Sequence, residues 1–144
     1  AQAKGIFSGE CDLGLGNTYY VGLMKNNEKD TEQKDWYKSM KVLFPNTEDR
    51  GTHVNISGMA LAKHSPNKDA ALKLMEFLAS GTAQEIYAEK VYEYPLKPSA
   101  KVSDDVAGFG EIKPDTLSLE KIAKLRKKAS QLVDKVGYDE GPSS

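Results

Sequence analysis

The hydrophobic and polar positions along the chain predict several helices, of which the last is the longest. From Ser118 onward, apolar residues recur at three- and four-residue spacing up to Gly137, which predicts one long amphipathic helix that ends at a glycine. A shorter stripe with the same period runs through residues 36–44. It follows a capping pair that begins at Asp30, and it precedes Pro45, which ends the helix.

Two further helices are predicted in the middle of the chain. Ser65 followed by Pro66 is typical of a helix start, and the apolar positions after it repeat at helical spacing until Gly81. Thr82 and Glu85 have the spacing of a capping box, which predicts a second, shorter helix.

Two stretches are predicted to be strands. Residues 13–15 are a brief apolar run that ends in a glycine turn and leads into a helix over residues 19–24. Cys11, just before this run, is predicted to be a buried, inert side chain. Residues 53–63 alternate at first and then become mostly apolar, which is the strongest strand signal in the chain. Together the elements predict an α/β fold.

Length and charge exclude several classes of protein. A chain of 144 residues, 39% of them hydrophobic, has the composition of one soluble globular domain. Its 20 basic and 21 acidic residues give a formal charge of −1, so no global field attracts nucleic acid or an anionic membrane. No apolar run approaches the ~20 residues that span a bilayer. The single cysteine permits no internal disulfide.

The common motifs of catalysis are missing from the sequence. It contains no G-x-S-x-G nucleophile elbow, no phosphate-binding loop, no H-E-x-x-H motif and no paired cysteines. His53 and His64 lie too far apart along an extended segment to share one ion and are interpreted as ordinary histidines. The sequence therefore predicts a protein that is not an enzyme.

Two adjacent tyrosines are the strongest candidates for a binding site. Tyr19 and Tyr20 follow the glycine turn at a predicted helix start, where neighbouring phenols can converge on one point. A phenol titrates near pH ~10 in water, but a bound trivalent cation can keep it deprotonated, and the hard phenolate oxygen suits Fe(III). Asn17 can cap the same helix and help to hold an anion there. The alternative is that both tyrosines are packing residues.

Four short motifs follow one another along the chain. They are Gly-Glu-Cys-Asp-Leu-Gly-Leu-Gly-Asn-Thr-Tyr-Tyr over residues 9–20, Phe-Pro-Asn over 44–46, Arg-Gly-Thr-His-Val-Asn-Ile-Ser-Gly over 50–58, and Tyr-Glu-Tyr-Pro-Leu-Lys-Pro over 92–98. In this order they resemble the C-terminal half of bacterial ferric-iron-binding proteins of ABC transporters, and the resemblance covers residues 5–137. It implies that Tyr19 and Tyr20 supply two phenolates to Fe(III). It also implies that Asn17 contacts a synergistic anion, as in some members of that family.

The resemblance further implies a fold and a cellular role. The fold is part of a two-lobed periplasmic-binding-protein (type II) fold that lacks its N-terminal half. Residues 1–52 would belong to the iron-binding C-terminal lobe, residues 53–98 to a crossover strand and helices returning toward the other lobe, and residues 99–144 to an irregular segment and the long helix. Gly58 would let the crossover bend as part of a hinge. The implied function is capture of Fe(III) in the periplasm, or at the cell surface as a lipoprotein-like protein, for delivery to a membrane permease.

The chain is expected to be a fragment. Its first seven residues are too short and too polar for a signal peptide, and the resemblance places a missing lobe before them. Such a fragment would expose apolar surface and sheet edges, which favours self-association.

Two other functions stay open on the residues alone. The same fold could bind an organic or oxyanion ligand, with the tyrosines stacking on it or hydrogen-bonding to it. The chain could also be a structural or interaction domain that recruits a protein partner through residues 95–98 or through the basic cluster at residues 124–128. That cluster contains Leu125 at a core position and is better explained as a solvated helix face than as a nucleic-acid site.

Overall fold

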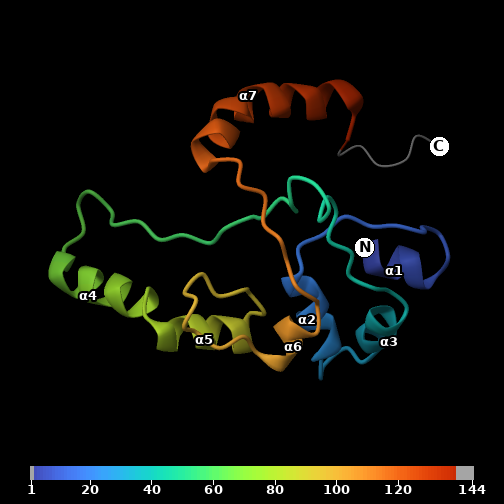
Figure 1. Ribbon diagram of the computed structural model, residues 1–144, viewed down its shortest axis with the longest axis horizontal. Coiled ribbons are helices and arrows are strands. Elements are labelled where there is room, and N and C mark those ends of the chain that lie inside the picture. Colours follow the sequence, from blue (N-terminus) through green and yellow to red (C-terminus); the bar gives the residue numbers. More distant parts are fainter. Residues whose placement is uncertain (1, 139–144) are drawn as a thin grey trace.

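The computed structural model describes residues 2–138, which form seven helices (Figure 1). The helices are α1 (Gln2–Phe7), α2 (Tyr19–Lys25), α3 (Glu32–Lys38), α4 (Lys68–Leu78), α5 (Gly81–Lys90), α6 (Asp104–Ala107) and α7 (Leu119–Val136). Among the described residues the backbone forms no strand ladder, and one isolated parallel bridge joins Thr52 to Pro114.

The helices pack in two groups. Helix α3 packs against both α1 and α2, and α5 packs against α4 and α6. In Figure 1 the extended residues 53–63 run between the row of α4 and α5 on one side and α7 on the other. Helix α7 therefore lies apart from the helices that carry the candidate site.

A small apolar core joins the two groups. Ala88 of α5, Val106 of α6 and Phe109 are buried together, and five partly buried residues pack around them. These five are Val21, Val42, Phe44, Tyr92 and Tyr94. Because Val21 belongs to α2, the core fixes the helix that begins with the tyrosine pair against α5 and α6.

Polar contacts reinforce the attachment of α2 to α6. Lys25 at the end of α2 forms an ion pair with Asp105, and the Asn26 side-chain amide donates a hydrogen bond of 2.8 Å to the other carboxylate oxygen. The hydrogen bond from Lys25, helped by the one from Asn26, lowers the pKa of Asp105. The end of α2 is thus held by two charge-assisted hydrogen bonds to one carboxylate.

Two of the predicted helices are confirmed. Helix α7 begins after Ser118, whose Oγ accepts a hydrogen bond from the backbone N–H of Lys121, and it ends at Gly137 in the left-handed conformation (φ 61°). Helix α2 begins at Tyr19, as the sequence predicts. Both predictions depend on local signals, namely caps and the spacing of apolar residues.

The ends of three other helices differ from the prediction. Helix α3 ends at Lys38, so residues 40–44 are not helical and the apolar stripe continues beyond the helix. Helix α4 has Asn67 at its N-cap position rather than Ser65. Helix α5 begins one residue before Thr82, because the Oγ of Ser80 accepts the hydrogen bond from the backbone N–H of Ala83. At the starts of α4 and α5, two residues that can act as N-caps lie two positions apart.

The predicted strands do not form within the described residues. Leu13 and Leu15 are 79% and 78% exposed, and Cys11 is exposed as well. Residues 53–63 are extended but pair with no other backbone. A strand is stable only when a neighbouring strand takes up its N–H and C=O groups, and residues 2–138 supply no such neighbour.

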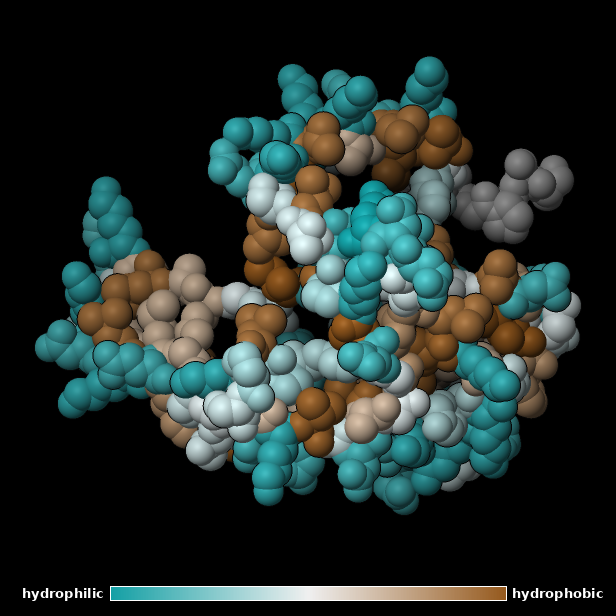
Figure 2. All heavy atoms as spheres, in the orientation of Figure 1, coloured by the Kyte–Doolittle hydropathy of each residue, from teal (hydrophilic) through white to brown (hydrophobic). Residues whose placement is uncertain are grey.

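Apolar side chains consequently lie on the surface in several places. Figure 2 shows brown, apolar residues over much of the viewed face between the polar rims. On α7 and α4 the exposed residues include Leu125, Leu132, Leu74 and Phe77. Single exposed apolar residues are ordinary, but so many on amphipathic helices indicate surfaces that another chain or segment can cover.

Candidate functional site

The tyrosine pair occupies the first turn of α2. Tyr19 and Tyr20 are the first two residues of the helix, and their ring centroids are 4.3 Å apart with the ring planes inclined by 39°. Adjacent side chains on a regular helix point about 100° apart. At this helix start the two tilted rings nevertheless lie close enough for their phenol groups to interact.

The phenol groups influence each other. The pKa of Tyr20 is raised above its ordinary value by a hydrogen bond with the Tyr19 phenol and by the repulsion that a Tyr19 phenolate would exert. Tyr20 is 51% exposed, and Tyr19 is half-buried. Without a cation, therefore, the neighbouring phenols resist losing both protons, whereas a cation placed against them would reverse this preference.

Asn17 lies just before the helix, but it does not cap it. The N-cap position is occupied by Thr18, and no side-chain hydrogen bond caps α2. The backbone carbonyl of Asn17 accepts a hydrogen bond of 3.3 Å from the N–H of Tyr20. The Asn17 side chain is exposed, and the predicted capping role is wrong because the helix begins one residue too late for it.

Asn17 and the tyrosine pair line one broad groove. Its walls come from the turn before α2, from residues 53–59 and from residues 92–96. The groove encloses about 2500 Å³, which is far more than a single ion needs. It is therefore an open surface on which a further segment can close.

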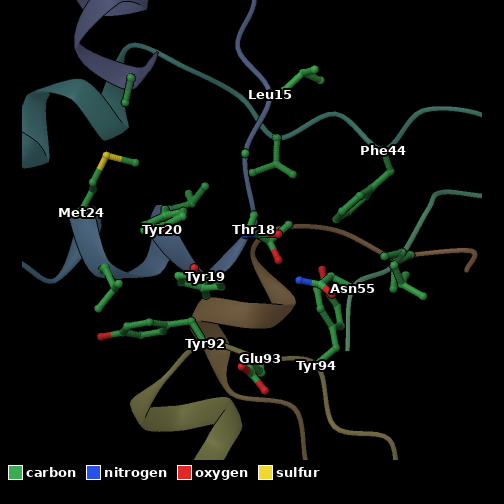
Figure 3. Close-up of a pocket in the computed structure, with 18 of the residues that line it drawn as sticks. Leu15, Thr18, Tyr19, Tyr20, Met24, Phe44, Asn55, Tyr92, Glu93 and Tyr94 are labelled. Atoms are coloured by element: carbon green, nitrogen blue, oxygen red, sulfur yellow. The ribbon is translucent and has the colours of Figure 1, made fainter. Parts of the chain in front are cut away.

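Residues 92–94 lie opposite the tyrosine pair. Figure 3 shows Tyr92, Glu93 and Tyr94 along the side of the groove that faces Tyr19. The Ser57 hydroxyl donates a hydrogen bond of 2.8 Å to Glu93 Oε1, and the Tyr94 hydroxyl donates one of 2.8 Å to the carbonyl of Gly110. Burial raises the pKa of Tyr94, so this tyrosine acts as a neutral hydrogen-bond donor.

The sequence pattern does not predict the contact between residues 92–94 and α2. The ring of Tyr92 lies against the buried Gly22 of α2, seventy positions earlier in the chain. Tyr92 also has a positive φ of 59°, which is unusual for a residue with a large side chain. The glycine inside the helix was the one sequence signal of a close approach.

Other candidate ligands are not gathered near the tyrosines. His53 and His64 are both exposed, at the two ends of the extended segment, as predicted. Within residues 2–138, no three His, Cys, Asp or Glu side chains come together in a way that could hold a metal ion. No helix in the same range is long and apolar enough to cross a membrane.

Comparison with known proteins identifies the class of protein that this groove belongs to. Residues 1–85 match the family of bacterial extracellular solute-binding proteins, and the chain belongs to this family. The solved structures that it resembles have the type II periplasmic-binding fold. The predicted fold class is therefore confirmed, although the strands of that fold are unpaired among the described residues.

The relatives also confirm the resemblance seen in the four motifs. The chain is 43% identical to Iron uptake protein A1 of Synechocystis over 96% of its own length and 38% of that protein. It is similar to the ferric binding protein of Campylobacter jejuni, with 41% identity, a TM-score of 0.87 and coverage of 94% of this chain and 42% of that one. A Trichodesmium protein solved with iron and citrate ligands is 37% identical, with a TM-score of 0.86 over 94% of this chain and 42% of its own.

The chain spans about two fifths of the length of the relatives it matches. Two of these relatives are named for iron uptake or ferric binding, the third was solved with iron and citrate, and none of the three names refers to catalysis, which fits the prediction of a protein that is not an enzyme.

Proposed function

We propose that this chain belongs to a solute-binding protein that captures Fe(III) through the phenolates of Tyr19 and Tyr20 and delivers it to a membrane permease. The observation that carries this proposal is the close tyrosine pair at the start of α2, with ring centroids 4.3 Å apart, at the edge of an open groove. The names of the relatives, which include iron uptake and ferric binding proteins, support the same ligand.

The chemistry of two phenolates selects a hard trivalent cation. Phenolate oxygen is an anionic, hard donor, and a phenol at neutral pH gives up its proton only to a strongly polarising ion. A softer divalent ion prefers thiolate or imidazole ligands, and no cluster of these lies among the described residues. The tyrosine pair therefore favours Fe(III). When the ion binds, each of the two phenols releases its proton.

Two phenolates fill only part of an iron shell, so other groups must complete it. One contribution is an anion, for which Asn17 is our candidate contact because its exposed side chain lines the groove two positions before Tyr19. The Trichodesmium relative holds citrate together with iron, which supports an anion at such a site.

The remaining ligands would come from a second lobe that closes over the groove. We assign residues 1–52 to the iron-binding lobe, residues 53–98 to the crossover and the helices that return toward the other lobe, and residues 99–144 to the C-terminal segment. Hinge closure places the missing ligands over an ion that the tyrosines have already bound. A protein of this kind works outside the cytoplasmic membrane, in the periplasm or at the cell surface.

The experiment that tests the proposal is an equilibrium competition for Fe(III) between the protein and citrate. The double substitution Tyr19→Phe/Tyr20→Phe removes both donor oxygens and keeps both rings, so the fold should persist while ferric binding is lost. Tyr138→Phe is the matched control, because this exposed tyrosine follows α7 and does not line the groove. Unchanged affinity in the double variant would refute the ligand assignment. An unsubstituted protein that takes no Fe(III) from citrate would favour an organic or oxyanion ligand.

A further inference from the structure

We infer that Tyr92 is a positioning residue for the two iron phenolates, and that it acts by packing against Gly22 in α2. The inference rests on the proposed function, since it concerns the geometry of the same ferric site. Tyr92 does not bind the iron. It fixes the position of α2, the helix that carries Tyr19 and Tyr20, in the groove.

The contact between Tyr92 and Gly22 is too close for any side chain at position 22. A Cβ atom at Gly22 would lie 2.6 Å from Cδ1 and 2.7 Å from Cβ of Tyr92. The first contact could be relieved by turning the ring, but the second could not, because the backbone fixes the position of the Tyr92 Cβ. The backbone of α2 at Gly22 is therefore packed directly against the Cβ and the ring of Tyr92, at one helical turn or less from both tyrosines of the pair.

The backbone of Tyr92 is itself held in an unfavourable conformation. Its φ of 59° lies in the left-handed region, where a large side chain is rare. Such a conformation persists only where the surrounding structure over-determines it. The packing of the Tyr92 ring on α2 is one of the contacts that hold it.

The two residues that follow Tyr92 hold the same segment from other sides. Glu93 accepts the 2.8 Å hydrogen bond from Ser57, which lies in the extended residues 53–63. The Tyr94 hydroxyl donates to the carbonyl of Gly110, and its ring lies 6.4 Å from those of Phe44 and Phe109. Three successive side chains thus join the tyrosine helix, the extended segment and the apolar core.

This arrangement gives residues 92–94 a mechanical role. If residues 53–63 move when a ligand closes the groove, the hydrogen bond from Ser57 transmits the movement to Glu93. Tyr92 then passes it to α2 through Gly22. A change at this contact should therefore alter the geometry of the ferric site and not only the stability of the fold.

The test is a visible absorption titration with ferric citrate, which reports the phenolate-to-iron charge-transfer band. It is made on the full chain and, if this chain is part of a longer protein, on that protein. Gly22→Ala should shift the band and weaken ferric binding by about tenfold or more, as loss of a group that orients metal ligands typically does. Gly81→Ala is the matched control, since Gly81 also lies in a helix and no atom lies within 4 Å of its Cβ position.

A second substitution separates geometry from a general loss of fold. In Gly22→Ala/Tyr92→Gly both the ring and the Cβ that clash are gone, so the band should return toward its original position relative to Gly22→Ala. The four proteins form a double-mutant cycle whose coupling term isolates the contact. If Gly22→Ala alone does not fold, the band of Tyr92→Gly must differ from that of the unsubstituted protein.

The results distinguish this inference from the proposed function. A band that is absent in the unsubstituted protein would overturn the ferric site, and the role of Tyr92 with it. A band that is present, and unmoved in folded Gly22→Ala or Tyr92→Gly, would leave the ferric site standing and overturn the positioning role.

Discussion

The number of protons that leave the protein when iron binds is the quantity most closely linked to the tyrosine pair. An ordinary phenol titrates near pH ~10, so deprotonating one at pH 7 costs about 4 kcal/mol. For Tyr20 the cost is higher, because the hydrogen bond with Tyr19 and the repulsion between phenolates raise its pKa. Both phenols must therefore release a proton to the solvent when they bind Fe(III).

The release of two protons sets the pH dependence of iron binding. Each released proton makes the apparent affinity rise by about tenfold per pH unit below the phenol pKa, so two protons give about a hundredfold per unit between pH 6 and 8. In each of the single variants Tyr19→Phe and Tyr20→Phe, the apparent affinity for Fe(III) should rise only about tenfold per pH unit. In the double variant no phenol of the pair releases a proton, so this part of the pH dependence should disappear.

Isothermal titration calorimetry with ferric citrate, in two buffers of different ionisation enthalpy, counts these protons. Citrate takes up or releases the same number of protons with every variant, so the differences between variants belong to the protein. We expect one proton fewer per iron in each single variant. If Tyr20→Phe binds iron with the same proton release as the unsubstituted protein, Tyr20 is not a phenolate ligand.

Three further predictions concern the fold around the site. Gly51→Ala should lower the free energy of unfolding in urea by about 1–3 kcal/mol. Gly51 has a φ of 98°, and a Cβ there would lie 2.7 Å from the carbonyl oxygens of Lys113 and Pro114. Gly58→Ala is the control and should leave the stability unchanged, because no atom lies within 4 Å of the Cβ position at Gly58. Asp105→Asn should cost about 1 kcal/mol or less at pH 7, since the Lys25 partner is partly exposed. The lowered pKa of Asp105 means that its ion pair stabilises the fold above the unfolded pKa and is lost as pH falls through the folded one, so this variant and the unsubstituted protein should converge in acid. The exposed apolar faces predict that the 144-residue chain forms dimers or larger species in sedimentation velocity, and a monomer at high concentration would contradict that prediction.

Local signals predicted the parts of the fold that depend on neighbours in sequence. Helix α7 follows from Ser118, from the apolar spacing and from Gly137, all within twenty residues, and α2 follows from the glycine turn before Tyr19. The cap of α5 was misassigned because Ser80 and Thr82 are two positions apart and both can accept the first hydrogen bond. Such errors move a helix end by one or two residues and do not change the fold.

Contacts between distant residues could not be predicted in this way. Residues 13–15 and 53–63 carry the composition of buried strands, but burial and pairing depend on a partner that the described residues do not provide. The contact of Tyr92 with Gly22 joins positions seventy residues apart, and nothing in the spacing of either segment predicts the other. The tyrosine pair could be proposed from the sequence because its two members are adjacent and belong to a motif that resembles a known family.

The most direct measurement of the central claim is a visible absorption titration of the unsubstituted protein and of Tyr19→Phe/Tyr20→Phe with ferric citrate. We expect a phenolate-to-iron charge-transfer band that saturates at one iron per protein and is absent from the double variant. A protein that stays colourless, or a band of equal strength in the double variant, would contradict the assignment of Tyr19 and Tyr20 as ferric ligands.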